Sequence, residues 1–182
     1  MSVELVTVDA QANCIAAQPS PNNPGATVGG SPAIVKFKQP LASGDTLQII
    51  TPVTSLWNSG GGPEDTNADG VPIAIDGTIQ WAKLNPDHPT QDPKGTGGQV
   101  TLPYPNAHNY NFGIGCLVGS LDSGQSFFAI GTNFQITILG NGLLSNTKPP
   151  SIPVLWLFYW DINCLDNESQ LSITVSHIPA TS

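Results

Sequence analysis

Glycine and proline interrupt this chain at short intervals, and that feature constrains its fold more than any other. The sequence contains 19 Gly and 17 Pro, and no window between them sustains the periodicity of an amphipathic helix. The intervening runs are short and either alternate apolar with polar residues or are continuously apolar, which is typical of strands. We therefore predict an all-β fold, a sandwich or a barrel. Of these we expect a jelly-roll-like β-sandwich of two antiparallel sheets with long loops, a single domain that spans residues 1–182.

Alternation and turn residues place the expected strands. Segments 18–31 and 92–111 are rich in Pro, Gly and Asn and are predicted to be irregular loops. The run 33–38 alternates, and its Lys36 and Lys38 favour the edge of a sheet, because exposed lysines discourage pairing with another strand. The expected strands are 3–8, 33–38, 46–51, 78–84, 113–119, 126–130, 134–139, 154–160 and 171–176.

The charge of the chain argues against one large class of partners. Its formal net charge is −8, and all five of its basic residues are Lys. Nucleic acids and phosphate groups are usually bound by a basic face that includes Arg, so we predict no nucleic-acid partner. Only 10% of the residues are charged. Surface polarity must then come mostly from Ser, Thr, Asn and Gln, which suits hydroxyl-rich ligands and equally an inert surface.

Expectations about location and thiol chemistry come from features that the sequence lacks. No apolar run reaches transmembrane length, so we predict no membrane insertion. Residues 1–5 lack the basic and apolar regions of a secretory signal, which predicts a soluble protein that is cytoplasmic or released without such a signal.

The cysteines are odd in number and lack metal-binding spacing, so at least one thiol is free and no disulfide framework is implied. They are Cys14, Cys116 and Cys164.

The densest group of oxygen ligands follows the last aromatic run. Residues 154–160 are expected to form a strand buried on both faces, and residues 171–176 a half-buried strand, so the loop between them has fixed ends. Oxygen ligands without a neighbouring His or CxxC favour a hard ion, most often calcium. A polar turn held by Asx hydrogen bonds is the alternative. The side chains that would converge are Asp161, Asn163, Asp166 and Asn167.

A second stretch has the spacing of a calcium loop. Residues 65–70 match the D-x-N-x-D-G start of such loops, and Asp76 falls at the twelfth position, where a carboxylate closes them. Pro72 lies inside the stretch and no helices flank it, so this would be a loop site in a β protein. A turn rich in Asp and Gly is the alternative. The ligands of this second calcium would be Asp65, Asn67, Asp69 and Asp76.

Several motifs in their order along the chain resemble those of the calcium-dependent galactophilic lectins of the soluble Pseudomonas type. The strand from Gly44 that ends near Trp57 resembles one whose closing aromatic residue binds calcium through its main-chain carbonyl. His88-Pro89-Thr90-Gln91 is similar to the His-Pro-x-Gln sugar loop of that family. Residues 115–118 resemble its Gly-Ala-Leu-Val strand, and residues 161–167 resemble its calcium loop.

The resemblance covers residues 41–178 and has clear departures. The calcium loop is shorter than the family's, Asp166 stands where an Asn is usual, and Trp57 replaces a Tyr. Because the ligand at Trp57 would be a backbone oxygen, that replacement need not disturb the metal. The extra carboxylate at Asp166 should strengthen calcium binding, since ligand charge raises affinity. Insertions lie around residues 14–31, 59–86, 92–110 and 140–150.

The resemblance implies a mechanism of sugar binding through a metal ion. Calcium accepts six to eight oxygens, so protein ligands leave positions for two neighbouring sugar hydroxyls. The cis 3- and 4-hydroxyls of galactose fit one ion, and Asp161 and Asp166 would also accept hydrogen bonds from them. His88 and Gln91 would contact the 6-hydroxyl, with Pro89 holding their loop rigid. The implied calcium ligands are Asp161, Asp166, Asn167 and the carbonyls of Trp57 and Asn163.

The same resemblance implies a homo-oligomer, a dimer or tetramer, that binds galactose-containing glycans, because a single shallow calcium–sugar site is weak. Two other classes stay open. The chain could be a structural or assembly module that calcium stabilises. A glycoside hydrolase is the other, but it needs two carboxylates about 5 to 10 Å apart, one of them protonated, whereas Asp161 and Asp166 would share a cation that keeps both ionised. With no G-x-S-x-G signature either, we predict that the chain is not an enzyme.

Overall fold

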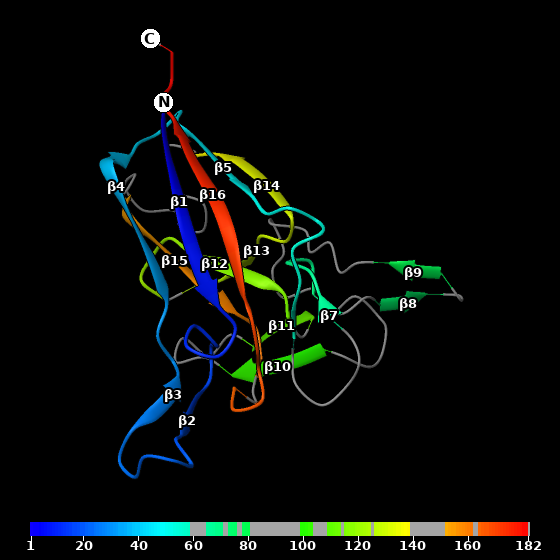
Figure 1. Ribbon diagram of the computed structural model, residues 1–182. Coiled ribbons are helices and arrows are strands. Elements are labelled where there is room, and N and C mark those ends of the chain that lie inside the picture. The colour runs from blue at the N-terminus through cyan, green and yellow to red at the C-terminus, as the bar shows by residue number, and fades with distance from the viewer. Residues whose placement is uncertain are drawn as a thin grey trace.

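The computed structural model describes residues 1–58, 65–70, 73–75, 78–80, 99–103, 109–113, 115–124, 126–138, 152–161 and 164–181. These ranges contain strands and no helix (Figure 1). The strands are β1 Ser2–Asp9, β2 Ala17–Pro19, β3 Thr27–Gly29, β4 Ala33–Leu41, β5 Thr46–Ile50, β6 Trp57–Asn58, β7 Asp65–Thr66, β8 Ile73–Ile75, β9 Thr78–Gln80, β10 Gln99–Pro103, β11 Asn109–Gly113, β12 Leu117–Ser120, β13 Phe128–Ala129, β14 Asn133–Thr137, β15 Ile152–Tyr159 and β16 Gln170–Ile178.

Two four-stranded sheets form the body of the protein. Their strand orders are β1-β16-β5-β14 and β13-β12-β15-β4, and the strands within each sheet pair antiparallel. One hydrophobic core draws on both sheets: Val8, Leu47, Ile49, Leu171, Ile173 and Val175 from the first, and Val35, Leu117, Leu155, Leu157 and Tyr159 from the second. The predicted all-β sandwich of antiparallel sheets is therefore confirmed.

Strands β1 and β16 pair along their whole length. The register runs from Ser2 opposite His177 to Asp9 opposite Gln170. Both chain ends lie together at one end of the sandwich, and the β15–β16 connection lies at the other (Figure 1). The alternation of apolar and polar residues along these strands explains which side chains are buried, because residues two apart on a strand face the same side. These two ends are called the terminal end and the loop end below.

Strand β15 is buried on both faces near its end, as predicted. Its inner face contributes Leu155, Leu157 and Tyr159 to the main core. On the outer face Phe158 and the adjoining Trp160 belong to a second cluster. Full burial of each large apolar side chain stabilises the fold by about 1.5–3 kcal/mol, so β15 is firmly held where the predicted calcium loop begins. The second cluster also contains Ile15, Phe112, Cys116, Val118 and Phe127.

Sequence and structure agree at the expected sheet edge and differ in the two predicted loops. The run 33–38 lies in β4, the outermost strand of its sheet, and its lysines are exposed. The loop predicted at 18–31 contains the hairpin β2–β3, and the irregular stretch 92–111 contains most of the hairpin β10–β11. Both predictions of irregular structure were wrong there, because isolated two-stranded hairpins need few alternating residues and tolerate Pro at a strand end.

One disulfide joins Cys14 to Cys164, which are 150 residues apart in the sequence. The prediction of at least one free thiol is confirmed by the buried Cys116. The expectation that no disulfide is implied is corrected, since an odd cysteine count cannot show which pair the fold brings together. Within the described ranges no helix has the length and apolar character of a membrane span.

Candidate functional site

The predicted calcium loop begins where β15 ends, at the loop end of the sandwich. Asp161 follows the fully buried Trp160 and is itself only 3% exposed. Asn167, near the other end of the loop, is also 3% exposed, whereas Asp166 is exposed. The predicted ligand Asn163 lies outside the described residues. The structure thus buries a carboxylate and an amide on this loop and leaves the second carboxylate at the surface.

The 9–16 turn after β1 fastens this loop. Ala10 N–H donates to the Ser169 carbonyl at 3.0 Å, and the Asn167 side-chain amide donates back to the Ala10 carbonyl at 3.2 Å. The Gln11 side-chain Nε2 donates to the Leu165 carbonyl at 3.1 Å. With the disulfide at Cys164, these bonds hold the loop from one side along most of its described length.

The hairpin β2–β3 packs against the same disulfide. Gly29 has φ of +76°, and a Cβ placed there would lie 2.2 Å from the Ala16 carbonyl oxygen and 2.9 Å from Cys164 Sγ. Only glycine allows that approach at that backbone conformation. The Cys164 N–H also donates to the Gln18 side-chain oxygen at 2.6 Å. The β2–β3 hairpin, which was not predicted from the sequence, therefore supports the candidate site directly.

Asn167 carries the feature of the loop that points most directly to a ligand. Its Nδ2 is bonded to Ala10, but its Oδ1 is buried and has no hydrogen-bond partner among the described residues. A buried acceptor without a partner costs about 1–3 kcal/mol. A calcium ion is a partner that an amide oxygen can take.

Trp57, the predicted main-chain ligand, is placed beside the start of this loop. Its side chain is fully buried and its Nε1–H donates to the Gly115 carbonyl at 2.9 Å. Gly115 N–H donates in turn to the Trp160 carbonyl at 2.9 Å. The Trp57 ring meets the Tyr159 ring edge to face, with centroids 4.5 Å apart. These contacts join the segment that ends at Trp57 to the end of β15.

The structure brings some of the predicted residues together and says nothing of others. Trp57, Asp161 and Asn167 belong to segments that meet at the loop end. The sugar-loop residues His88, Pro89 and Gln91 lie outside the described residues. In the described part of the chain no three His, Cys, Asp or Glu side chains form a metal-binding group. The predicted calcium set has a different composition, two carboxylates with amide and main-chain oxygens.

The second predicted calcium stretch forms a turn that is fixed to a neighbouring loop. Asn67 Oδ1 accepts the Asp69 N–H at 2.9 Å, which is an Asx turn. Asp69 Oδ1 accepts the Thr132 N–H at 2.7 Å, and the Thr132 hydroxyl lies within 3.1 Å of both carboxylate oxygens. Asp65 lies in β7, and Asp76 is outside the described residues. The second calcium stays a prediction, and Asp69 binds Thr132 in the structure.

Asp69 also acts on the free cysteine next to it. Burial, and after it the negative charge of Asp69, raise the pKa of the Cys116 thiol to about 12, although a hydrogen bond with the Gly131 backbone lowers it. The thiolate is the reactive form of cysteine, so this thiol is chemically inert at neutral pH. It takes no part in the candidate site.

A buried contact between a histidine and an aspartate at the terminal end was not anticipated from the sequence. His177 Nε2 lies 2.7 Å from Asp45 Oδ2, and the two side chains are 4% and 10% exposed. His177 occupies the same face of β16 as the core residues Ile173 and Val175. Alternation alone would have indicated a buried His. Its partner depends on the pairing of β16 with β5, which the sequence does not specify.

Comparisons with protein-family models, curated proteins and solved structures find no match for this chain.

Proposed function

We propose that this protein is a calcium-dependent lectin that binds galactose and galactosides. The observation that carries the proposal is the buried Asn167 Oδ1, which has no hydrogen-bond partner among the described residues. It belongs to a loop that starts at a buried carboxylate, Asp161, and exposes a second one, Asp166. A hard cation with oxygen ligands fits these three groups.

The proposed site binds sugar through the ion. Asp161, Asp166 and Asn167, with the carbonyls of Trp57 and Asn163, supply the protein oxygens, and two neighbouring sugar hydroxyls fill the remaining positions. The two carboxylates also accept charge-assisted hydrogen bonds from those hydroxyls. His88 and Gln91 contact the 6-hydroxyl from a loop that Pro89 stiffens. Each site is weak, so the protein acts as a homo-oligomer, a dimer or tetramer, on clustered glycans.

The loop end supports this arrangement by its rigidity. The disulfide and the bonds to Ala10 hold the loop before any ion binds. Ordering a loop at the moment of binding lowers affinity, so a loop that is already fixed binds its ion more tightly. The packing of Trp57 on Tyr159 fixes a second ligand segment against the same strand end.

Retention on immobilised galactose tests the proposal. The wild-type protein should be retained in calcium and released by a chelator. Asp166→Ala should weaken calcium binding by about tenfold or more, because ligand charge sets the affinity of such sites. Glu168→Ala is the matched control: it removes the same charge from an exposed position close by on the chain and should leave retention unchanged.

Other outcomes would identify the competing classes. Stability that falls on chelation without any retention on galactose would indicate a calcium-stabilised structural or assembly module. Turnover of a chromogenic galactoside would indicate a hydrolase. A protein with neither calcium-dependent retention nor calcium-dependent stability would end the proposal.

A further inference from the structure

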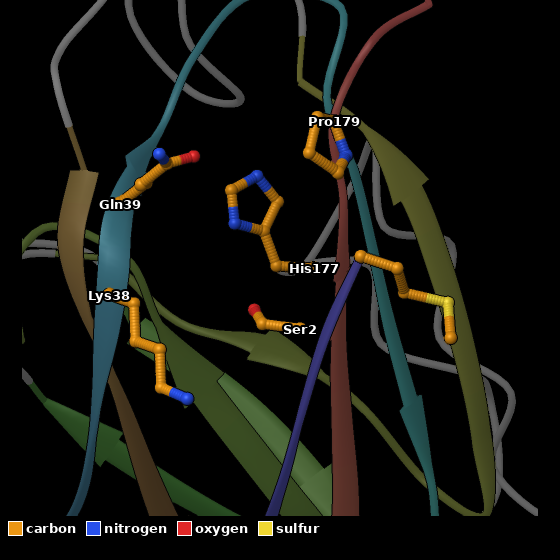
Figure 2. A pocket seen from close by; sticks show the side chains of 6 residues that line it. Ser2, Lys38, Gln39, His177 and Pro179 are labelled. Carbon is orange, nitrogen blue, oxygen red and sulfur yellow. The ribbon is translucent and has the colours of Figure 1, made fainter.

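A cavity of about 340 Å³ lies at the terminal end of the sandwich, away from the proposed calcium loop. It lies between β1 and β16 of one sheet and β4 of the other (Figure 2). The imidazole of His177 projects from β16 toward β4, where Lys38 and Gln39 are located. The lining residues are Met1, Ser2, Lys38, Gln39, His177 and Pro179.

The His177 ring is fixed in orientation. Its Nε2 is bonded to Asp45 Oδ2 at 2.7 Å, and its edge packs on the Phe37 ring with centroids 6.0 Å apart. Asp45 is fixed in turn by the Ala42 N–H at 2.9 Å and the Ala180 N–H at 3.0 Å. A side chain held in this way by its neighbours presents its free atom in one direction only.

The protonation of this pair follows from the charge of Asp45. Desolvation raises the pKa of Asp45, but the bonds from Ala42, Ala180 and His177 outweigh it, so the pKa lies below the ordinary value of 3.8. Asp45 is therefore ionised at neutral pH, and the proton of the contact belongs to His177 Nε2. The second ring nitrogen, Nδ1, is left to the cavity (Figure 2). It can donate a hydrogen bond when the ring is protonated.

Four of the six lining residues carry polar side chains, and none of the six carries a side-chain carboxylate. Lys38 brings an ammonium group that makes no ion pair within the described residues. Ser2 lies directly opposite His177 in the β1–β16 register, so its hydroxyl is on the same face of the sheet as the imidazole. Gln39 adds a side-chain amide. This grouping of cationic and donor side chains occurs in a protein whose net charge is −8.

We propose that this cavity binds an oxyanion, the carboxylate or phosphate group of a small molecule. Lys38 supplies the charge, and His177, Ser2 and Gln39 supply hydrogen bonds. The chain has no Arg, so it cannot bind an oxyanion through the two parallel hydrogen bonds of a guanidinium group. A Lys ammonium group can still bind one as a point charge. The site is independent of the proposed calcium–sugar site, which lies at the other end of the sandwich.

Titration calorimetry with small probes tests the inference. The full chain, in chloride buffer, should give saturable heat with inorganic phosphate or with acetate. The probe that binds more tightly identifies the source of the oxyanion. Lys38→Gln should weaken binding by about tenfold, the effect of losing one charge-assisted contact. Lys36→Gln, which removes the same charge from the same strand outside the cavity, should leave binding unchanged.

Nuclear magnetic resonance supplies a second readout. The His177 ring resonances should shift when the probe binds, because the imidazole lines the cavity. No saturable heat with any probe, equal loss in Lys36→Gln and Lys38→Gln, or unmoved His177 resonances would overturn the inference.

Discussion

The two ends of the sandwich treat their buried polar groups in opposite ways. At the terminal end, Asp45 is surrounded by donors from Ala42, Ala180 and His177. At the loop end, Asn167 donates to Ala10 but its own buried oxygen accepts nothing within the described residues. Both groups are almost fully removed from water.

The difference separates two uses of buried polarity. A carboxylate whose oxygens are bonded to protein donors contributes to stability and has no need of a cation. A buried acceptor that the protein leaves without a partner carries an energetic cost that a ligand can remove. The terminal end therefore keeps its donors bonded beside a cavity, while the loop end leaves a buried acceptor, as the proposed calcium site requires.

The largest effect should come from removing the disulfide. The two cysteines are 150 residues apart. For a closed loop of that length the chain-entropy model gives a stabilisation of about 5 kcal/mol. Cys14→Ser with Cys164→Ser should lower the free energy of unfolding, measured in urea, by several kcal/mol, within the usual range of about 2–5 kcal/mol. Cys116→Ala is the control for a cysteine outside the bridge and should cost less.

Hydrogen exchange on the double variant would show whether the two ends are separate. Amides fastened to the loop end, such as Ala10 and Ile15, should lose protection, because their partners are Ser169 and Tyr159. The Ala180 amide at the terminal end should keep its protection relative to global unfolding. Equal loss at both ends would contradict the contrast.

The next effect in size should come from Asp45→Asn. The Asn side chain keeps the shape but removes the charge that accepts the bonds from Ala42, Ala180 and His177, which should cost about 1–3 kcal/mol. Glu168→Gln at an exposed position should stay within about 0.5 kcal/mol. The folded-state pKa of Asp45 is depressed. Ionised Asp45 therefore contributes its full share to the free energy of unfolding above the pKa that it has in the unfolded chain. That share is lost as the pH falls through the lower pKa of the folded state. In urea unfolding from pH 7 downward, the free energies of unfolding of the wild type and the variant should converge. A difference that stays constant with pH would contradict the depressed pKa of Asp45.

The smallest effect should come from Asn167→Leu in calcium-free buffer. The change removes the bond to Ala10 together with the buried acceptor, so the two contributions largely cancel and the free energy of unfolding should change by about 1 kcal/mol or less. Calcium should then raise the melting temperature of the wild type and not of the variant. A variant that calcium still stabilises would place the ion elsewhere.

Local alternation predicted much of the fold. It placed the strands that contain Val8, Ile49 and Val175 and the lysine-bearing edge strand β4, since each depends on residues close in sequence. Pairings across the chain could not be predicted in this way. The disulfide and the Asp45–His177 pair each join positions that meet only through the order and register of the strands.

The candidate site was predictable to a similar extent. The position of Asp161 and Asn167 beside a buried aromatic strand follows from composition and from the strand ends that flank them. The Asn167 oxygen could not be recognised as unpartnered, because that depends on Ala10 and the turn after β1. The sequence also gave no sign that the β2–β3 hairpin would support the disulfide, because the contact requires Gly29 at a left-handed backbone position.

The Cys14–Cys164 bridge has a mechanical consequence. It closes a covalent ring that leaves outside only residues 1–13 and 165–182, and the strands in those two tails pair with each other. Both tails start from the same end of the molecule (Figure 1). Tension applied at the two ends would peel β1 from β16 one pair at a time and stop at the bridge, which carries the load and spares the strands within the ring.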